Sequence, residues 1–408
     1  MSWPELRMAA HPIAFLNSAV DTPGGFLWLR GGAQPKLLVW QPAMIDWIFR
    51  NDQRLRHPGS RSLAAVLGRR SLLWAEDPRH AAYRELLDPA LHGRRLDNYR
   101  GIVAEAVHTA VDALRPGTVV ELPGWTRQLT LRIIARILLG QADDAVLAAF
   151  TSWIERALGA RHRTLAYRWL MGGLPGSGPE LDRMLVRSAK SHVDNQPRPL
   201  AALMLAGDGP LGGLDDAELR DAIVSLLFAG HETTAAATAW TLYWLDRIPS
   251  LRHDVRDELA GTAGSNASRT PLLHAVIQET LRLAPPVTVA EHRTLTTDAE
   301  IAGHRLPAGT TLSPSVYLAH HNPEQFPNPH RFDPNRFLGT RVPTRYYFPF
   351  GGGARHCVGS QLAHLEIRMI VAAVLGLRDW RCVNPRAGVP QPRGHAMAPA
   401  SRLRMRVL

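Results

Sequence analysis

One short stretch near the end of the chain gathers residue types that can activate a sulfur atom. The segment FPFGGGARHCVGSQLAHLEI, residues 348–367, places Cys357 after three glycines and before a helix-like pattern, in a chain with only two cysteines. The free amides at the start of a helix stabilise a thiolate, and so does a neighbouring cation such as Arg355. A thiolate here could serve as a nucleophile or a metal ligand; the alternative is a small buried apolar side chain. Cys382 has no such setting, and we interpret it as that alternative.

A second unusual stretch begins at residue 214, LDDAELRDAIVSLLFAGHETTAAATAWTLYWL. Asp215 followed by Glu218 forms a capping-box pattern, and no proline interrupts the sequence to about residue 246. The stretch is apolar nearly all round, which predicts a helix buried through the middle of the protein. Gly230 and Thr233 weaken a helix, and such a local violation inside a buried element is expected at a functional site.

Four motifs together carry a family resemblance. Phe350, Gly353, Arg355, Cys357 and Gly359 match F-x-x-G-x-[RH]-x-C-x-G, the haem-ligand signature of the cytochrome P450 family. Over nearly its whole length the chain resembles that family, and the four motifs follow one another in the order and spacing that the family requires.

The other three motifs lie upstream of the cysteine. Glu279 and Arg282 in ETLRL match the family's E-x-x-R pair, and Arg336 in FDPNRF matches the arginine that completes this triad. Glu232 and Thr233 in AGHETT match the acid–alcohol pair of the family's long central helix. The resemblance implies that the triad is a scaffold of hydrogen-bonded charges without a chemical role.

The resemblance also implies a fold. We expect a mainly α protein with a minor β lobe, the cytochrome P450 fold, in which the long central helix crosses a buried haem b. The chain should be one domain, with a lobe at about 22–75, 284–320 and 380–408. The patterns agree, because 26–32 and 35–40 read as a β-hairpin and helical patterns dominate from residue 78. These patterns predict helices at 101–114, 126–139, 143–158 and 179–192, and a loop at 173–178.

For the cofactor, the resemblance makes Cys357 the axial thiolate ligand of the haem iron. Gly351 and the other glycines would let the loop approach the porphyrin, and Phe350 would shield the sulfur from water. Haem propionates need buried cations as partners. The candidates that match the family are Arg355, Arg293, His80 and Arg84.

On the opposite face of the haem, Ala229 and Gly230 would leave room for dioxygen. Thr233 would hydrogen-bond the bound oxygen, and Glu232 would pass protons from water, since an alcohol and a carboxylate form a general-acid relay. The alternative is that the Thr233 hydroxyl only bonds its own helix. His231 should point away from the haem.

The substrate-contacting segments implied by the resemblance are 58–74, 159–178, 287–290 and 395–399. Our candidates for substrate contacts are Ala229, Val287, Thr288, Val289 and Met397. These segments are mostly apolar, which favours a hydrophobic small molecule such as a terpenoid, polyketide or fatty acid, in secondary metabolism.

Charge and hydrophobicity limit the partners and the location that we expect for the protein. The formal charge of +11 comes from 47 basic residues, of which only Lys36 and Lys190 are lysines. The arginines are spread along the chain and form no basic tail, so we exclude nucleic acid as a partner. No apolar run approaches the length of a membrane span, and the N-terminus lacks the pattern of an export signal. We expect a cytoplasmic monomer.

The predicted function is therefore that of a haem-thiolate monooxygenase. It would insert one oxygen atom from O2 into a C–H or C=C bond, with electrons from NAD(P)H delivered by a separate ferredoxin and ferredoxin reductase. Two alternatives remain open: a peroxide-driven or non-oxygenating haem-thiolate enzyme, and a haem-binding sensor without turnover. Both Glu232 and Thr233 are present, which argues against each.

Overall fold

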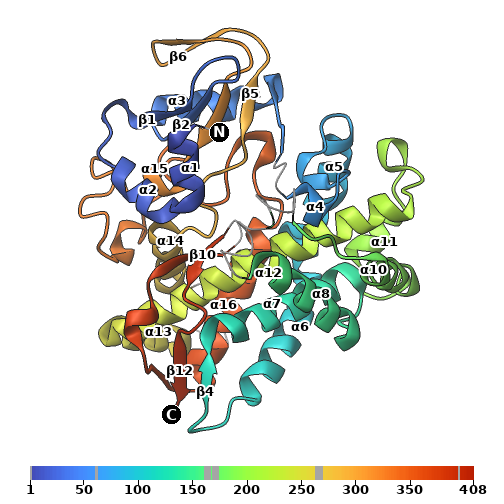
Figure 1. Ribbon diagram of the computed structural model, residues 1–408. Coiled ribbons are helices and arrows are strands. Elements are labelled where there is room, and N and C mark those ends of the chain that lie inside the picture. Colours follow the sequence, from blue (N-terminus) through green and yellow to red (C-terminus); the bar gives the residue numbers. More distant parts are fainter. Residues whose placement is uncertain (1, 60–62, 160–166, 168–173, 262–269, 394–395) are drawn as a thin grey trace.

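A helical body and a smaller strand-rich lobe make up the protein, and the long helix α12 runs through the middle (Figure 1). The structure is a computed structural model that describes residues 2–59, 63–159, 167, 174–261, 270–393 and 396–408. Three of the segments expected to contact substrate are only partly described. Most of 159–178 and parts of 58–74 and 395–399 lie outside the described residues.

The α-helices in the described ranges are α1 (Trp3–Ala10), α2 (Pro12–Ala19), α3 (Pro42–Arg50), α4 (Ala64–Leu67), α5 (Arg79–Leu91), α6 (Gly93–Asp112), α7 (Leu122–Leu139), α8 (Asp144–Leu158), α10 (Pro179–Ser191), α11 (Leu200–Leu205), α12 (Asp216–Arg247), α13 (Pro249–Gly261), α14 (Pro271–Leu283), α15 (Val316–His320) and α16 (Ser360–Leu377). The strands there are β1 (Phe26–Arg30), β2 (Lys36–Val39), β3 (Leu55–Arg56), β4 (Val119–Glu121), β5 (Arg293–Leu295), β6 (Ala299–Ile301), β7 (His304–Leu306), β8 (Thr311–Pro314), β9 (Trp380–Cys382), β10 (Pro390–Arg393), β11 (Ala396–Pro399) and β12 (Arg404–Val407).

Helix α12 has 32 residues and is therefore about 48 Å long. It begins where the Asp215 carboxylate accepts a hydrogen bond from the backbone N–H of Glu218, at 2.8 Å. The other half of the predicted capping box is replaced, because the Glu218 carboxylate instead pairs with Arg79 at 3.0 Å. The helix packs against α7, α14 and α16, and 22 of its 32 residues are buried, in agreement with the predicted burial.

The lobe contains a five-stranded sheet in the order β1-β2-β8-β5-β3. Strands β1 and β2 form the predicted antiparallel hairpin, with Phe26 opposite Val39. Strand β2 pairs in parallel with β8, so hydrogen bonds connect residues 36–39 near the start of the chain to residues 311–314, which follow α14 in sequence. This pairing places α3 and the turn after it beside the loop that carries Cys357.

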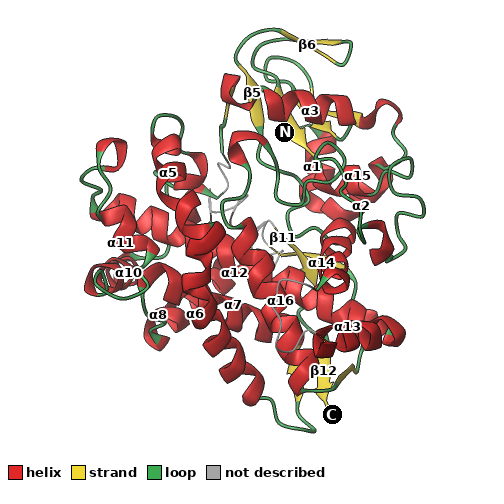
Figure 2. Cartoon of the chain, turned by 180° about the vertical axis from the view of Figure 1, so that it is seen from behind, coloured by secondary structure: helices red, strands yellow, loops and turns green. Residues whose placement is uncertain are grey.

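None of the strands in residues 380–408 joins this five-stranded sheet, although we expected these residues in the same lobe. Strands β9 and β12 pair with β4 in a separate three-stranded sheet, and β10 and β11 form a hairpin of their own. In both views the C-terminus lies at the end of the molecule opposite the five-stranded sheet (Figures 1 and 2). The sequence pattern marked strands but carried no signal for their partners, because register depends on long-range packing.

The predicted helices are present, but two start earlier than expected. Helix α6 begins at Gly93 and not at residue 101, because its first two turns (GRRLDNYR) are polar and show no apolar period. Helix α7 begins at Leu122, with Pro123 in its first turn, a position where proline is well tolerated. Within the described residues, α16 alone is long and apolar enough to cross a membrane, and half of it is buried inside the protein.

Candidate active site

The loop before α16 holds Cys357 in a fixed backbone frame. The backbone N–H of Cys357 donates to the carbonyl of Phe350 at 2.9 Å, and that of Gly351 donates to the carbonyl of Phe348 at 2.9 Å. Gly351 has a φ of +69°, in the left-handed region that favours glycine. The loop thus folds back on itself and presents Cys357 at the start of a long helix.

The environment of the Cys357 sulfur differs in part from the prediction. Cys357 is exposed, yet the protein packed around its sulfur raises the pKa of the thiol. The N–H of Gly359 and the charge of Arg84 oppose that effect. The helix-start amide acts as expected, but the cation that acts on the sulfur is Arg84 and not Arg355.

Arg355 is instead anchored beside the loop. Its Nη2 donates to the carbonyl of Ala75 at 2.6 Å, and its backbone N–H donates to Asp52 at 3.2 Å. The Nε atom is buried and has no hydrogen-bond partner among the described residues. A guanidinium with a buried, unused donor suits an anionic ligand group.

The predicted pair on α5 lies on the same side. Arg84 donates from Nη1 to the carbonyl of His356 at 2.7 Å and pairs with Asp88 at 3.0 Å. His80 lies 3.5 Å from Asp77, and burial together with the charge of Arg355 lowers the pKa of His80. The structure therefore brings His80, Arg84 and Arg355 together around the cysteine loop.

Arg293 lies in a different setting. It is fully buried, and its guanidinium binds the Asp52 carboxylate, with Nε 2.8 Å from Oδ1, and donates to the Gly352 carbonyl at 3.0 Å. Its charge is thus compensated inside the protein. Nearby Glu291 has a buried Oε1 without a partner among the described residues, and burial raises its pKa.

The middle of α12 presents the accessible face of an otherwise buried helix. Phe228, Ala229, Gly230 and Thr233 are partly exposed, whereas residues 221–227 and 234–243 are buried. The Thr233 hydroxyl donates to the carbonyl of Ala229 at 2.8 Å, the local bond we had considered as the alternative. At Gly230 a Cβ would come 2.8 Å from a side-chain carbon of Ile134, so close packing on α7 requires this glycine.

Glu232 points to a cluster of charges that the sequence did not reveal. Its carboxylate lies 3.1 Å from Arg393 Nε on β10 and 3.9 Å from Arg127 Nε on α7. Both arginines also pair with Glu155 on α8. His231 Nε2 lies 3.5 Å from Glu232, and its Nδ1 bonds the carbonyl of Leu227.

These neighbours decide the charge of Glu232. Burial alone would raise the pKa of this carboxyl group. The hydrogen bond from His231 and the charges of the two arginines outweigh burial and hold the pKa of Glu232 at about 2. The carboxylate is therefore ionised near neutral pH. Neighbouring side chains of a helix also diverge by about 100°, so Glu232 and Thr233 point in different directions.

The triad forms the predicted network of charges. Glu279 and Arg282 are fully buried, with Arg282 Nε 2.7 Å and Nη2 2.8 Å from the two carboxylate oxygens. Arg336 Nε lies 3.5 Å from Glu279, and the N–H of Asp333 donates to Glu279 at 2.9 Å. The network ties α14 to the segment that leads into the cysteine loop.

Comparisons with known proteins agree with one family. The model of the family "Cytochrome P450" matches residues 180–400. A Mycobacterium tuberculosis protein named cytochrome P450 135A1 is 33% identical, covering 85% of this chain and 79% of that protein. The Cyclooctat-9-en-7-ol 5-monooxygenase of Streptomyces melanosporofaciens is 30% identical over 91% of this chain and 85% of its own length. The chain is a cytochrome P450.

The fold agrees with that membership. The structure of cyanobacterial CYP120A1 with bound retinoic acid superimposes with a TM-score of 0.83, covering 97% of this chain and 94% of that one, at 24% identity. Cytochromes P450 are oxygen-incorporating oxidoreductases, so this P450 is a monooxygenase, and its family implies a haem cofactor.

The residues of this P450 fit a haem. The sulfur-bearing Cys357 is exposed, and so is part of the α12 face around Thr233. Arg355 Nε and Glu291 Oε1 are buried polar atoms without partners among the described residues, as expected beside a group that carries its own carboxylates. Cys357 would hold the iron of such a haem, and Arg355, His80 and Arg84 would hold its propionates. Phe350 is half-buried, its carbonyl accepts the backbone N–H of Cys357, and its ring centroid lies 5.1 Å from that of His364.

The predicted substrate contacts come together from two parts of the P450 chain. The N–H of Met397 on β11 donates to the carbonyl of Pro286 at 2.7 Å, which places the hairpin beside residues 287–289. Val287 is 38% exposed, and Thr288 and Val289 are half-buried, so all three have accessible surface. Met397 is only 1% exposed and packs into the core.

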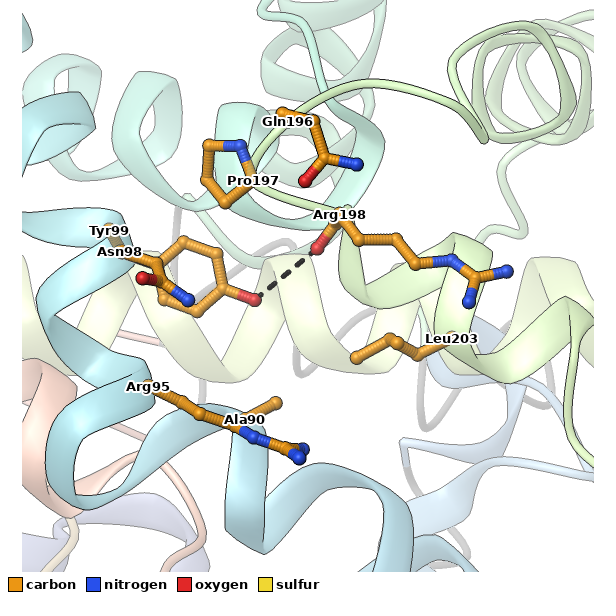
Figure 3. Close-up of a pocket in the computed structure, with 8 residues that line it drawn as sticks. All are labelled: Ala90, Arg95, Asn98, Tyr99, Gln196, Pro197, Arg198 and Leu203. Carbon is orange, nitrogen blue, oxygen red and sulfur yellow. Dashed lines mark hydrogen bonds between the residues drawn. The ribbon is translucent and has the colours of Figure 1, made fainter.

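One surface pocket lies away from these residues. A pocket of about 540 Å³ opens between the end of α5, the start of α6 and residues 196–203 (Figure 3). Its lining residues are Ala90, Arg95, Asn98, Tyr99, Gln196, Pro197, Arg198 and Leu203. None of the predicted site residues lines it, so we assign it no part in catalysis.

Proposed function

We propose that this P450 inserts one oxygen atom from O2 into a hydrophobic small molecule of secondary metabolism. The observation that carries the proposal is the accessible cysteine at the start of α16, in a fold where α12 also exposes Ala229 and Thr233. The apolar surface of Val287 and Val289 supports a hydrophobic substrate. The Streptomyces relative carries cyclooctat-9-en-7-ol in its name, which supports a terpenoid over a fatty acid.

A thiolate-ligated haem supplies the centre at which dioxygen is reduced and its O–O bond cleaved. The side chains of this protein would hold the haem and the substrate and transfer protons. The Thr233 hydroxyl donates its proton in a hydrogen bond to the Ala229 carbonyl. The lone pairs of its oxygen remain free to accept a hydrogen bond from a proton donor at the haem. Thr233 thereby holds a proton at one fixed position.

Glu232 acts differently from the simple relay expected from the sequence. A carboxyl group with a pKa of about 2 is almost never protonated near neutral pH, so it is a poor general acid. Its ionised oxygens instead accept hydrogen bonds and orient water that supplies protons to Thr233. The Arg393 and Arg127 guanidiniums set that charge and hold the carboxylate in place.

We also propose that electrons from NAD(P)H reach this P450 through a ferredoxin and a ferredoxin reductase. Helices α6 and α16 pack together behind the cysteine, and the N–H of Gly93 donates to Gln361 at 3.1 Å. Arg100 on α6 is exposed and Arg368 on α16 is half-buried, so this surface carries two guanidiniums whose charges interact. An acidic ferredoxin would dock there. We place the protein in the cytoplasm as a monomer.

A turnover under labelled oxygen tests the proposed function. Purified protein with a surrogate ferredoxin, its reductase and NAD(P)H is given 18O2 and a panel of terpenoid alcohols, and products are analysed by mass spectrometry. One 18O atom per product molecule is expected. Product that forms only from added hydrogen peroxide would instead indicate a peroxide-driven enzyme. Haem-loaded protein that consumes no NAD(P)H with any substrate would indicate a sensor.

Replacing Arg393 with glutamine is expected to make coupling depend on pH. Losing this cation leaves Glu232 buried beside the weaker Arg127 contact, so the pKa of Glu232 rises toward the working range. The product formed per NAD(P)H should then fall as pH drops through the raised pKa, whereas wild type shows no such inflection near neutral pH. Arg386→Gln, at an exposed arginine close in sequence, is the control. Parallel pH profiles for wild type and Arg393→Gln would refute this role.

A further inference from the structure

Asp52 is a buried carboxylate at the centre of contacts to the cysteine loop. It begins the short turn η2 (Asp52–Arg54) after α3 and is 2% exposed. Oδ1 accepts from Arg293 Nε at 2.8 Å and lies 3.0 Å from His57 Nε2. Oδ2 accepts from the backbone N–H of Arg355 at 3.2 Å and from Arg293 Nη2 at 3.3 Å. No motif drew attention to this residue.

These bonds keep Asp52 charged inside the protein. Burial opposes ionisation, but the hydrogen bonds from His57 and Arg293 outweigh it and hold the pKa of Asp52 far below its usual range. Arg293 is 1% exposed, so Asp52 is the group that compensates its charge. Removing a single partner of such a buried pair leaves an uncompensated charge at the site.

The same corner also fixes the glycines of the loop by close packing. A Cβ at Gly353, where φ is +70°, would come 2.5 Å from Asp52 Oδ2. A Cβ at Gly352 would come 2.5 Å from the ring of Phe49 on α3. These two glycines therefore allow the loop to approach the α3 corner, whereas the sequence had suggested approach to the porphyrin alone. Phe49 also packs edge-on against Phe348, with ring centroids 5.4 Å apart.

We propose that Asp52 is a positioning residue for the haem ligand, acting through the loop and through Arg293. The inference rests on the proposed function, since it takes Cys357 as the ligand of the iron. The Asp52 carboxylate accepts a hydrogen bond from the backbone N–H of Arg355, two residues before Cys357. This contact fixes the loop and so holds the sulfur where it can bind the haem iron. By neutralising Arg293, Asp52 also keeps one positive charge from acting on the haem, which leaves Arg355, His80 and Arg84 for the propionates.

Asp52→Asn tests this role with readouts other than activity. The variant keeps the shape but loses the charge, so Arg293 becomes an uncompensated cation near the haem and favours the reduced, less positive iron. The midpoint reduction potential should rise, measured by spectroelectrochemistry. The red-shifted Soret band of the reduced CO complex should also decay roughly 10-fold faster, as expected for a lost outer-shell contact. Asp46→Asn, an ion-paired surface carboxylate on α3, should match wild type.

The outcomes separate this inference from the proposed function. If wild type lacks the thiolate Soret band, the proposed function fails. If wild type has the band and Asp52→Asn matches it in potential and decay, the positioning role is overturned. If Asp52→Asn does not fold, His57→Leu decides, because it removes one hydrogen bond to Asp52 and keeps the charge pair with Arg293. Faster decay of the band in that variant supports the role, and wild-type decay overturns it.

Discussion

Thr233→Ala is expected to separate electron consumption from product formation. The variant should oxidise NAD(P)H at close to the wild-type rate. The product formed per NAD(P)H should fall roughly 100-fold, the lower end of the range for one positioned proton-transfer group. The hydroxyl oxygen beside the accessible face of α12 is lost, so a proton donor at the haem no longer has a fixed acceptor. The missing product should appear as hydrogen peroxide, quantified together with NAD(P)H and product.

Two variants control for effects on the helix itself. Thr241 bonds the carbonyl four residues earlier at 2.8 Å, as Thr233 does, but it is fully buried and distant from the accessible face. Thr241→Ala should therefore keep wild-type coupling, and Thr233→Ser should restore most of it. Wild-type coupling in Thr233→Ala would remove this residue from the proton path.

Glu279→Gln is expected to cause the largest loss of stability. Glu279 and Arg282 are both 0% exposed, and the carboxylate also accepts from the backbone N–H of Asp333. Leaving the Arg282 charge buried and unpaired should lower the free energy of unfolding by about 3–5 kcal/mol. Urea denaturation followed by circular dichroism measures the loss, and haem content should fall with it because the network supports the cysteine loop.

An exposed pair on the same protein provides the comparison. Glu180 lies 2.7 Å from Arg183 on α10, with both side chains largely exposed. Glu180→Gln should change the unfolding free energy by less than about 1 kcal/mol, as surface ion pairs usually do. Similar losses in the two variants would mean that the triad does not carry the stability assigned to it.

Sequence motifs predicted those parts of the site whose residues are close together in the chain. The cysteine loop, the acid–alcohol pair, the E-x-x-R pair and the helix pair His80 and Arg84 are each contiguous or one helical turn apart. In such cases local geometry limits where the side chains can lie. The hairpin of β1 and β2 was predictable for the same reason.

Contacts between distant segments were not predictable from one sequence. Arg393 reaches Glu232 across 161 residues, and Arg293 reaches Asp52 across 241 residues. No spacing rule links such pairs, and arginine is so common here that a single arginine gives no signal. The roles of Gly230 and Gly353 were also incomplete, because the atoms they accommodate belong to Ile134 and Asp52, which only the packed structure brings close.

The absorbance spectrum of the reduced protein with carbon monoxide tests the central claim, ligation of haem iron by Cys357, most directly. We predict the red-shifted Soret band of thiolate-ligated haem in wild type, its loss in Cys357→Ser, and its retention in Cys382→Ser, where the buried cysteine of β9 is changed. Folded wild-type protein without haem, or a shifted band that survives in Cys357→Ser, would contradict the claim.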